Sequence, residues 1–240
     1  MEKTNQAATT GNPLGTEGIG KLMLQFAIPA IVSNLVIAAY NLVDQAIIGN
    51  AIGMLGIAAT NIAFPLTPIS AAVGYLLGTG GASNYSLQLG AGNKEKSDKF
   101  AGNTLSLLVI TGAAIAAIVL IFVNPLVYAF GATETVKPLA LTYTSIISIG
   151  IPFGIFTTGA SALIRADGSP RYSMLCMLAG AVFNIIGDPI AVFVFKLGIA
   201  GVAWATTLGQ MMTAGIAIFY FVRKTKNISI RKKTSGRKSV

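Results

Sequence analysis

The stretch FAGNTLSLLVITGAAIAAIVLIFV, residues 100–123, contains no Asp, Glu, Lys or Arg. A helix of about 20 apolar residues, rising 1.5 Å per residue, crosses the roughly 30 Å hydrocarbon core of a membrane. Residues 100–123 are therefore predicted to form one membrane-spanning helix. Five further stretches of the 240-residue chain meet the same criterion. They are residues 22–48, 57–88, 138–163, 172–195 and 199–222.

The overall composition agrees with a membrane protein. Hydrophobic residues make up 53% of the chain and charged residues only 10%, whereas soluble domains carry about 25% charged residues. The predicted fold class is an all-α membrane protein whose six transmembrane helices form one bundle. A polar segment (1–20) precedes this bundle (21–222), and a basic tail (223–240) follows it.

The basic residues predict how the helices are oriented. Of the 17 Lys and Arg residues, 15 lie in the two terminal regions (residues 1–21 and 223–240), the second loop and the fourth loop, and the other loops hold only Lys137 and Lys196. Because cytoplasmic loops accumulate Lys and Arg, both termini are predicted to be cytoplasmic in the cell membrane. Eight of these bases lie in residues 223–240, which contain no acid. The tail is interpreted as an orientation signal that contacts anionic membrane lipids, and no nucleic-acid partner is predicted.

Several kinds of chemistry are excluded by missing residue types. The chain has no His and a single Cys, Cys176, so it cannot form a Ser-His-Asp triad, a His-ligated metal site or an internal disulfide. It also lacks the glycine-rich fingerprints of nucleotide-binding loops. No enzyme activity and no cofactor are predicted.

Two acids, Asp44 and Asp188, lie inside predicted spans. A charged side chain in the middle of a membrane costs roughly 2.5–3.5 kcal/mol on insertion scales, and such residues usually serve a function. Both acids lie toward the outer end of an outward-running helix. If the first and fifth spans touch, the two carboxylates share one polar cavity.

Other polar residues are spaced so that they share helix faces with these acids. Asn34 and Asn41 lie on the face of Asp44, and Asn184 precedes Asp188 by four residues. In the sixth span the residues that share one face are Thr206, Gln210 and Thr213.

Four of these residues are predicted to meet at a similar depth, namely Asp44, Asn184, Asp188 and Thr206. Their carboxylate, amide and hydroxyl oxygens are the ligands that hard cations such as Na⁺ prefer. A buried carboxylate also holds a proton more readily than one in water, so H⁺ is an equal candidate for the coupling ion. Asn34, Asn41, Gln210 and Thr213 are predicted to line the cavity. Alternatively, the polar groups serve only to join helices by hydrogen bonds.

Prolines inside the spans predict places where helices bend. Pro29 and Pro189 are the two of interest, because each removes a backbone hydrogen bond from its helix. Pro189 directly follows Asp188, so the helix is expected to loosen beside the carboxylate, as transporter helices do at ion sites. A static kink is the alternative interpretation.

Four segments resemble the N-terminal half of multidrug and toxic compound extrusion (MATE) transporters. They are GKLMLQFAIPA (20–30), NLVDQAIIG (41–49), LIRADGSPR (163–171) and NIIGDP (184–189). The resemblance covers residues 15 to 225, nearly the whole chain.

The resemblance implies a function and a site. Members of that family are Na⁺- or H⁺-coupled antiporters that export organic cations and other drugs. Their N-terminal six-helix lobe carries a cation site, which matches Asp44, Asn184, Asp188 and Thr206 here. A bend near the first-helix proline, here Pro29, is thought to couple protonation to drug release in some members.

The chain departs from the family in length. Family members have twelve spans in two lobes, and this chain has six predicted spans. It is therefore expected to be a truncated chain or one lobe of a pair, whose partner is a second six-helix lobe or another copy of the same chain.

Two other functions are alternatives to drug export. Flippases for lipid-linked saccharides share the architecture, but they line their cavity with basic residues for pyrophosphate, and the predicted spans contain no internal base. An intramembrane aspartyl protease also needs two Asp residues on neighbouring helices. However, such proteases carry Tyr-Asp and Gly-x-Gly-Asp patterns, whereas here Val43 precedes Asp44 and Ile185 replaces the first Gly before Asp188.

Overall fold

The computed structural model describes residues 18–228, and within that range the regular secondary structure is entirely helical. The predicted segments 1–20 and 223–240 therefore lie largely outside the described residues. The α-helices are α1 (Ile19–Ala51), α2 (Met54–Ala63), α3 (Leu66–Gly90), α4 (Lys94–Ile121), α5 (Val123–Ala129), α6 (Lys137–Ala166), α7 (Pro170–Pro189) and α8 (Gly198–Arg223). A π-helix, η2 (Ile190–Val194), continues α7.

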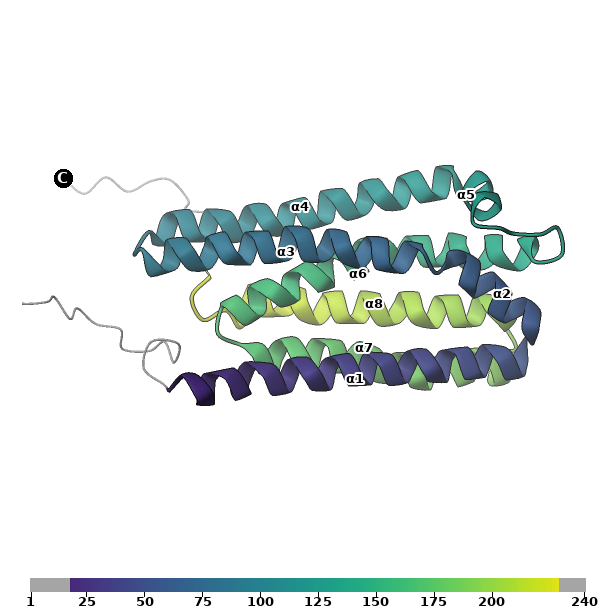
Figure 1. The fold of residues 1–240 in the computed structure, drawn as a ribbon, viewed down its shortest axis with the longest axis horizontal. Coiled ribbons are helices and arrows are strands. Elements are labelled where there is room, and N and C mark those ends of the chain that lie inside the picture. Colours follow the sequence, from purple (N-terminus) through teal and green to yellow (C-terminus); the bar gives the residue numbers. More distant parts are fainter. Residues whose placement is uncertain (1–17, 229–240) are drawn as a thin grey trace, which may run out of the picture.

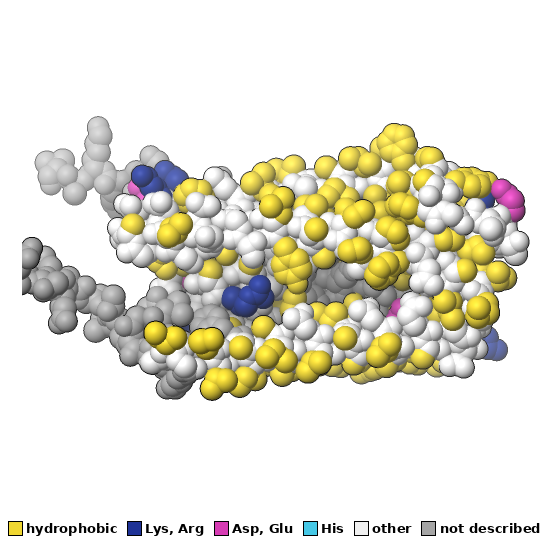
Figure 2. Space-filling view, in the orientation of Figure 1, with side chains coloured by type: hydrophobic (Ala, Val, Ile, Leu, Met, Phe, Trp, Pro, Cys, Tyr) yellow, Lys and Arg dark blue, Asp and Glu magenta, His cyan; other side chains and the backbone are white. Residues whose placement is uncertain are grey.

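Six segments of the described chain are long and apolar enough to cross a membrane, as predicted. Only helices and closed barrels satisfy every backbone polar group inside lipid, which explains why these apolar stretches are helical. Large apolar side chains remain exposed along the helices, for example Leu76, Ile110 and Ile121. Figure 2 shows such hydrophobic side chains spread over the length of the molecule. The chain is therefore a multi-pass membrane protein whose outer surface suits lipid.

Helix α6 lies at the centre of the bundle and packs against α3, α4 and α8. Helix α1 packs against α7, which in turn packs against α8 (Figure 1). We call proximal the end that contains the first residue of α1, the α3–α4 and α6–α7 turns, and residues 224–228. The opposite end, with the α1–α2 and α7–α8 connections and α5, is called distal.

Glycines allow α3 and α6 to approach closely. A Cβ atom built on Gly78 would lie 2.3 Å from the Cα atom of Gly159. Both helices thus present bare backbone at their crossing, which is the usual way for membrane helices to pack without a hydrophobic driving force. The largest buried cluster extends around this contact and includes Leu108, Ile155 and Leu163.

The second and third predicted spans differ in detail from the structure. The second is divided into α2 and α3 at Phe64 and Pro65, since proline cannot donate the backbone hydrogen bond that would continue the helix. The third is followed by the short helix α5, which hydropathy did not predict. Small apolar residues of α5 and of residues 132–140 pack against α2 at the distal end.

One prediction about charge inside the spans is wrong. The predicted fourth span ends at residue 163 and leaves Arg165 in a loop, but α6 continues to Ala166, so Arg165 lies in the last turn of a membrane-spanning helix. Its side chain is half-buried and lines a cavity. The argument against a flippase, that the spans contain no internal base, therefore does not hold.

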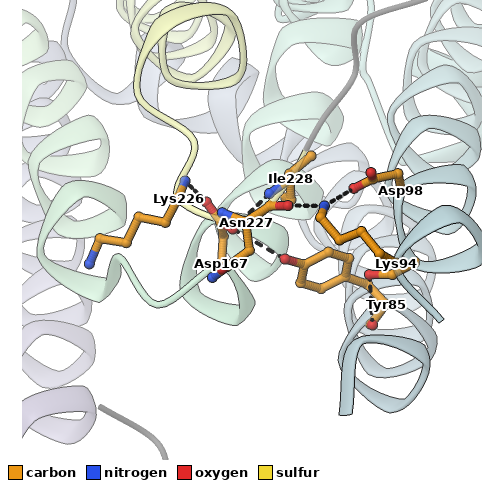
Figure 3. A network of polar contacts seen from close by, with 8 residues as sticks. Tyr85, Lys94, Asp98, Asp167, Lys226, Asn227 and Ile228 are labelled. Carbon is orange, nitrogen blue, oxygen red and sulfur yellow. Dashed lines mark hydrogen bonds and ion pairs between the residues drawn. The ribbon is translucent and has the colours of Figure 1, made fainter. Parts of the chain in front are cut away.

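A buried carboxylate joins three parts of the proximal end (Figure 3). Asp167, placed in a turn by the sequence, is 0% exposed. It accepts hydrogen bonds from the hydroxyl groups of Tyr85 in α3 (3.2 Å) and Tyr220 in α8 (2.6 Å). The backbone N–H groups of residues 226, 227 and 228 also donate to it, at 2.7, 2.8 and 3.1 Å. Lys94 of α4 donates to the backbone carbonyl of Asn227. The chain after α8 is thus held against the bundle.

Candidate functional site

The two membrane-embedded acids meet in the distal half of the bundle. Asp44 lies in the last third of α1 and Asp188 is the next-to-last residue of α7. Because α1 packs along α7, the two carboxyl groups lie near enough to interact electrostatically. The Asp44 side chain is 8% exposed and that of Asp188 is 0% exposed. The structure therefore brings these two carboxyl groups into one part of the bundle.

Asn184 links this pair to α8. Its side-chain nitrogen lies 3.5 Å from Oδ1 of Asp188, one helical turn further on, and donates to Oγ1 of Thr206 at 3.0 Å. Helices α7 and α8 come together here because Gly209 packs against the α7 backbone at Gly180. The four residues predicted to form the cation site thus lie together in the structure.

Several oxygen atoms of this cluster have no hydrogen-bond donor among the described residues. They are Oδ1 of Asp44, Oδ1 of Asn184 and Oδ2 of Asp188, all buried. Buried polar atoms normally have a partner, and two adjacent carboxylates repel when both are ionised. The ion pairs of the described residues, Lys94–Asp98 and Lys99–Glu95, lie on α4 at the proximal end. The cluster is therefore suited to take up positive charge.

The arrangement offers ligands to a proton or a monovalent cation. Within residues 18–228 no group of three His, Cys, Asp or Glu side chains is gathered that could hold a metal ion. A cation at the cluster would instead have two carboxylates, one amide oxygen and one hydroxyl as ligands. Oxygen donors of this kind suit hard ions.

Two tyrosines belong to the cluster and were not predicted. Tyr40 of α1 and Tyr143 of α6 both lie near enough to Asp44 and Asp188 to interact with them electrostatically. Tyr40 precedes Asp44 by four residues, so helical spacing was the signal that could have identified it. Tyr143 has no such signal in its own helix, because only the packing of α6 brings it to the site.

A cavity of about 160 Å³ adjoins the cluster between α1, α6, α7 and α8. Asn184 and Thr206 line it, and so do Gln210 and Thr213. Asn34 lines a different cavity nearer the proximal end. Asn41 is exposed on α1 and is not among the residues that line these two cavities.

The two prolines of interest lie in different surroundings. Pro189, which follows Asp188, is the last residue of α7, and the helix then changes to the wider π-helix η2 at Ile190. Pro29 lies inside α1, which continues across it as one helix (Figure 1). Ser33 donates to the carbonyl of Pro29 at 2.7 Å. A bend at Pro29 stays a prediction.

The model of the MatE family matches residues 29–190. This segment includes Asp44, Asn184 and Asp188, together with three whole membrane spans and most of two others. The chain belongs to the MatE family. The resemblance noted in the sequence is thereby confirmed.

The relatives are transport proteins of about twice the length. The FAD transporter of Shewanella oneidensis is 27% identical over 210 residues, which cover 86% of this chain and 46% of the relative. The multidrug export protein MepA of Staphylococcus aureus is 28% identical, over 88% of this chain and 47% of the relative. The chain thus spans about half the length of the curated relatives it matches, and it groups with transporters rather than with enzymes.

A solved MatE-family structure has the same fold. The crystal structure of MATE in complex with MaD5 matches 96% of this chain with a TM-score of 0.87 and 27% identity. The match covers 52% of that chain. The six-helix bundle therefore corresponds to about half of that larger MatE structure.

Proposed function

We propose that this chain works in an antiporter that exports small organic molecules across the cell membrane, driven by Na⁺ or H⁺. The observation that carries the proposal is the buried pair Asp44 and Asp188, whose unpaired oxygens have no basic partner among the described residues. Two carboxylates at membrane depth are costly. A cation that neutralises the two carboxylates offsets this cost.

The coupling ion would be held by the chain's own oxygen atoms. Na⁺ would take ligands from Asp44, Asn184, Asp188 and Thr206, and a proton would be shared between the two carboxyl groups. Neutralising the pair removes the repulsion between α1 and α7. Ion binding would therefore favour a conformation in which these helices lie closer together.

The neighbouring cavity offers a route for coupling the ion to a cargo. Asn184 and Thr206 belong both to the ion cluster and to the cavity wall. A change in their hydrogen bonds on ion uptake would alter the cavity that Gln210 and Thr213 also line. The helix-weakening prolines Pro29 and Pro189 are the proposed bending points for this change.

The proposal also covers the transported molecule and a second six-helix lobe. The names of the relatives include a multidrug exporter and an FAD transporter, so the cargo class is small organic molecules, with cationic drugs as the first to test. The full drug path would need a second six-helix lobe or a second copy of this chain. A parallel arrangement of two such lobes is common in transporters.

Gradient-driven export tests the ion site. The chain, together with the lobe that completes the transporter, is reconstituted in vesicles, and the efflux of ethidium is followed after imposing a Na⁺ gradient or a proton gradient. We expect Asp188→Asn and Asp44→Asn each to reduce the gradient-driven rate at least about tenfold, because a neutral side chain cannot exchange the ion. The gradient that drives efflux identifies the coupling ion.

Glu134→Gln is the matched control, because Glu134 is an exposed acid outside the cluster. Its efflux rate should stay within about twofold of the parent rate. Unchanged gradient-driven efflux in Asp188→Asn would show that the ion is bound elsewhere.

A further inference from the structure

A second polar cavity lies in the proximal half of the bundle, between α1, α3, α6 and α7. Its volume is about 230 Å³. The polar residues that line it are Ser33, Asn34, Tyr75, Arg165 and Ser173, and no acid is among the lining residues. It shares only Met177 with the cavity beside the carboxylate cluster. The two cavities therefore differ in charge: acids adjoin one, and a base lines the other.

The guanidinium of Arg165 is largely unused by the protein. Its Nη1 atom donates to Oγ of Ser173 at 3.3 Å. No carboxylate lies within ion-pairing distance of it among residues 18–228. A guanidinium has five N–H donors, so most of them have no acceptor among the described residues. A half-buried positive charge without a counter-charge is costly inside a membrane protein.

The helix that faces Arg165 adds positive potential. Pro170 and Ser173 belong to the first turn of α7, and both line the cavity. No acid lies in that turn, and the N-cap residue Ser169 makes no capping hydrogen bond through its side chain. The dipole of a helix N-terminus attracts anions. Arg165 and the N-terminus of α7 therefore both contribute positive potential to this cavity.

Figure 2 shows a hollow between the rows of α1 and α3, with a basic side chain inside it and an acidic one further along. A ligand that reaches the basic cavity through this hollow need not pass the carboxylate cluster, which lies nearer the distal end.

We propose that this cavity binds an anionic group of the phosphate type, with Arg165 as its principal ligand. The planar guanidinium fork matches the oxygens of a phosphate in a two-point contact. The Asn34 amide and the Tyr75 hydroxyl, on the other walls, are further donors. The phosphate belongs either to the headgroup of an anionic lipid or to a soluble phosphorylated molecule. The site is separate from the proposed ion coupling and does not depend on it.

Calorimetry with two probes tests the site and distinguishes the two sources. The 240-residue chain is purified in a neutral detergent and titrated with inorganic pyrophosphate and with dioctanoyl phosphatidylglycerol. Dioctanoyl phosphatidylcholine, which has no net charge, serves as the reference lipid. We expect saturable binding of at least one anionic probe, and weaker or no binding of the reference lipid.

The variant Arg165→Gln should weaken that binding about tenfold, the usual loss for one charge-assisted two-point contact. Arg171→Gln is the matched control, since Arg171 is exposed at the same end of α7 and does not line the cavity. It should change the affinity less than about twofold. If Arg165→Gln does not fold, Ala30→Leu narrows the cavity without touching the guanidinium and should cause a similar loss.

Each outcome decides the proposal. Binding of pyrophosphate assigns a soluble phosphorylated ligand, and binding of phosphatidylglycerol that pyrophosphate does not displace assigns a lipid headgroup; both support the site. The proposal is overturned if neither anion binds, if phosphatidylcholine binds as tightly as phosphatidylglycerol, or if Arg171→Gln weakens binding as much as Arg165→Gln.

Discussion

Single residues in this molecule differ sharply in how well their role can be inferred. Asp167 follows the fourth span in a polar turn and looks like an ordinary surface acid in the sequence. In the structure it is fully buried and accepts hydrogen bonds from two tyrosines and three backbone N–H groups. Five donors around one carboxylate are enough to offset the cost of burying its charge. Asp167 thus fixes the chain after α8 to the bundle.

Asp167→Asn should destabilise the protein. The amide nitrogen of Asn is a donor and would face donors, and the charge that strengthens the remaining hydrogen bonds would be lost. We expect a loss of about 2–4 kcal/mol in the free energy of unfolding, measured as a lower melting temperature of the purified chain in detergent.

The control for this change is Glu95→Gln, which removes an exposed acid at the same end of the molecule. Glu95 pairs with Lys99 on the surface of α4, and their side chains are 80% and 70% exposed. Exposed pairs of this kind contribute about 0.3–0.5 kcal/mol. Equal melting temperatures for the Asp167 and Glu95 variants would contradict the structural role of Asp167.

The two acids of the ion cluster, in contrast to Asp167, can be identified from the sequence. Asp44 and Asp188 were identified because a carboxylate inside an apolar span is costly, and that cost can be read from composition alone. Asn184 and Tyr40 are four residues away from these acids and lie on the same helix faces. Tyr143 could not be inferred, because its place in the cluster depends on where α6 packs.

At the scale of helices, the contact between α3 and α6 depends on missing side chains. Gly78 faces the backbone of Gly159 at a distance that leaves no room for a Cβ atom. Close backbone contact is a main source of stability between membrane helices. The pattern of glycines suggested packing positions in the sequence, but not which helix would lie opposite.

Gly78→Ala should therefore push α3 and α6 apart. The new methyl group would lie 2.3 Å from the Gly159 Cα atom, and backbone cannot move aside as a flexible side chain can. Overpacking of this kind costs about 1–3 kcal/mol, which thermal unfolding in detergent would measure.

Gly80→Ala, on the same helix, has open space around its new methyl group. It controls for the general effect of replacing Gly by Ala in a helix and should leave the melting temperature unchanged or slightly higher. A fall in the Gly80 variant as large as that in the Gly78 variant would mean that close packing is not the cause.

Helix ends were the least predictable elements. The break between α2 and α3 follows Pro65 and has a local cause, but hydropathy merges the two helices because both are apolar. The extension of α6 by one turn past the predicted span brought Arg165 into the bundle. That single turn changes which ligands the proximal cavity suits.

For the whole molecule, the distribution of Lys and Arg predicts which end faces the cytoplasm. Fifteen of the 17 basic residues lie in segments that belong to the proximal end or continue from it. Because basic loops remain on the cytoplasmic side, the proximal end is expected to be cytoplasmic and the distal end, with the carboxylate cluster nearer to it, external.

Cysteine labelling in intact cells tests this orientation. The native Cys176 is 0% exposed and should not react. Asn93→Cys places a thiol in the exposed α3–α4 turn, and Thr133→Cys places one in the exposed α5–α6 connection. A membrane-impermeant maleimide should label the Thr133 variant in intact cells and the Asn93 variant only after permeabilisation. The reverse pattern would invert the predicted topology.

The number of spans, the membrane location and the two embedded carboxylates follow from amino-acid order alone, because hydropathy and charge act over a few consecutive residues. Family membership also follows from order, through four short segments spread along the chain. The neighbours of each group were decided by packing between helices far apart in the sequence. That packing joins Asp44 to Asp188, buries Asp167 under Tyr85 and Tyr220, and leaves Arg165 facing a cavity without an acid. Such contacts depend on the relative position and rotation of whole helices, and no local pattern carries that information.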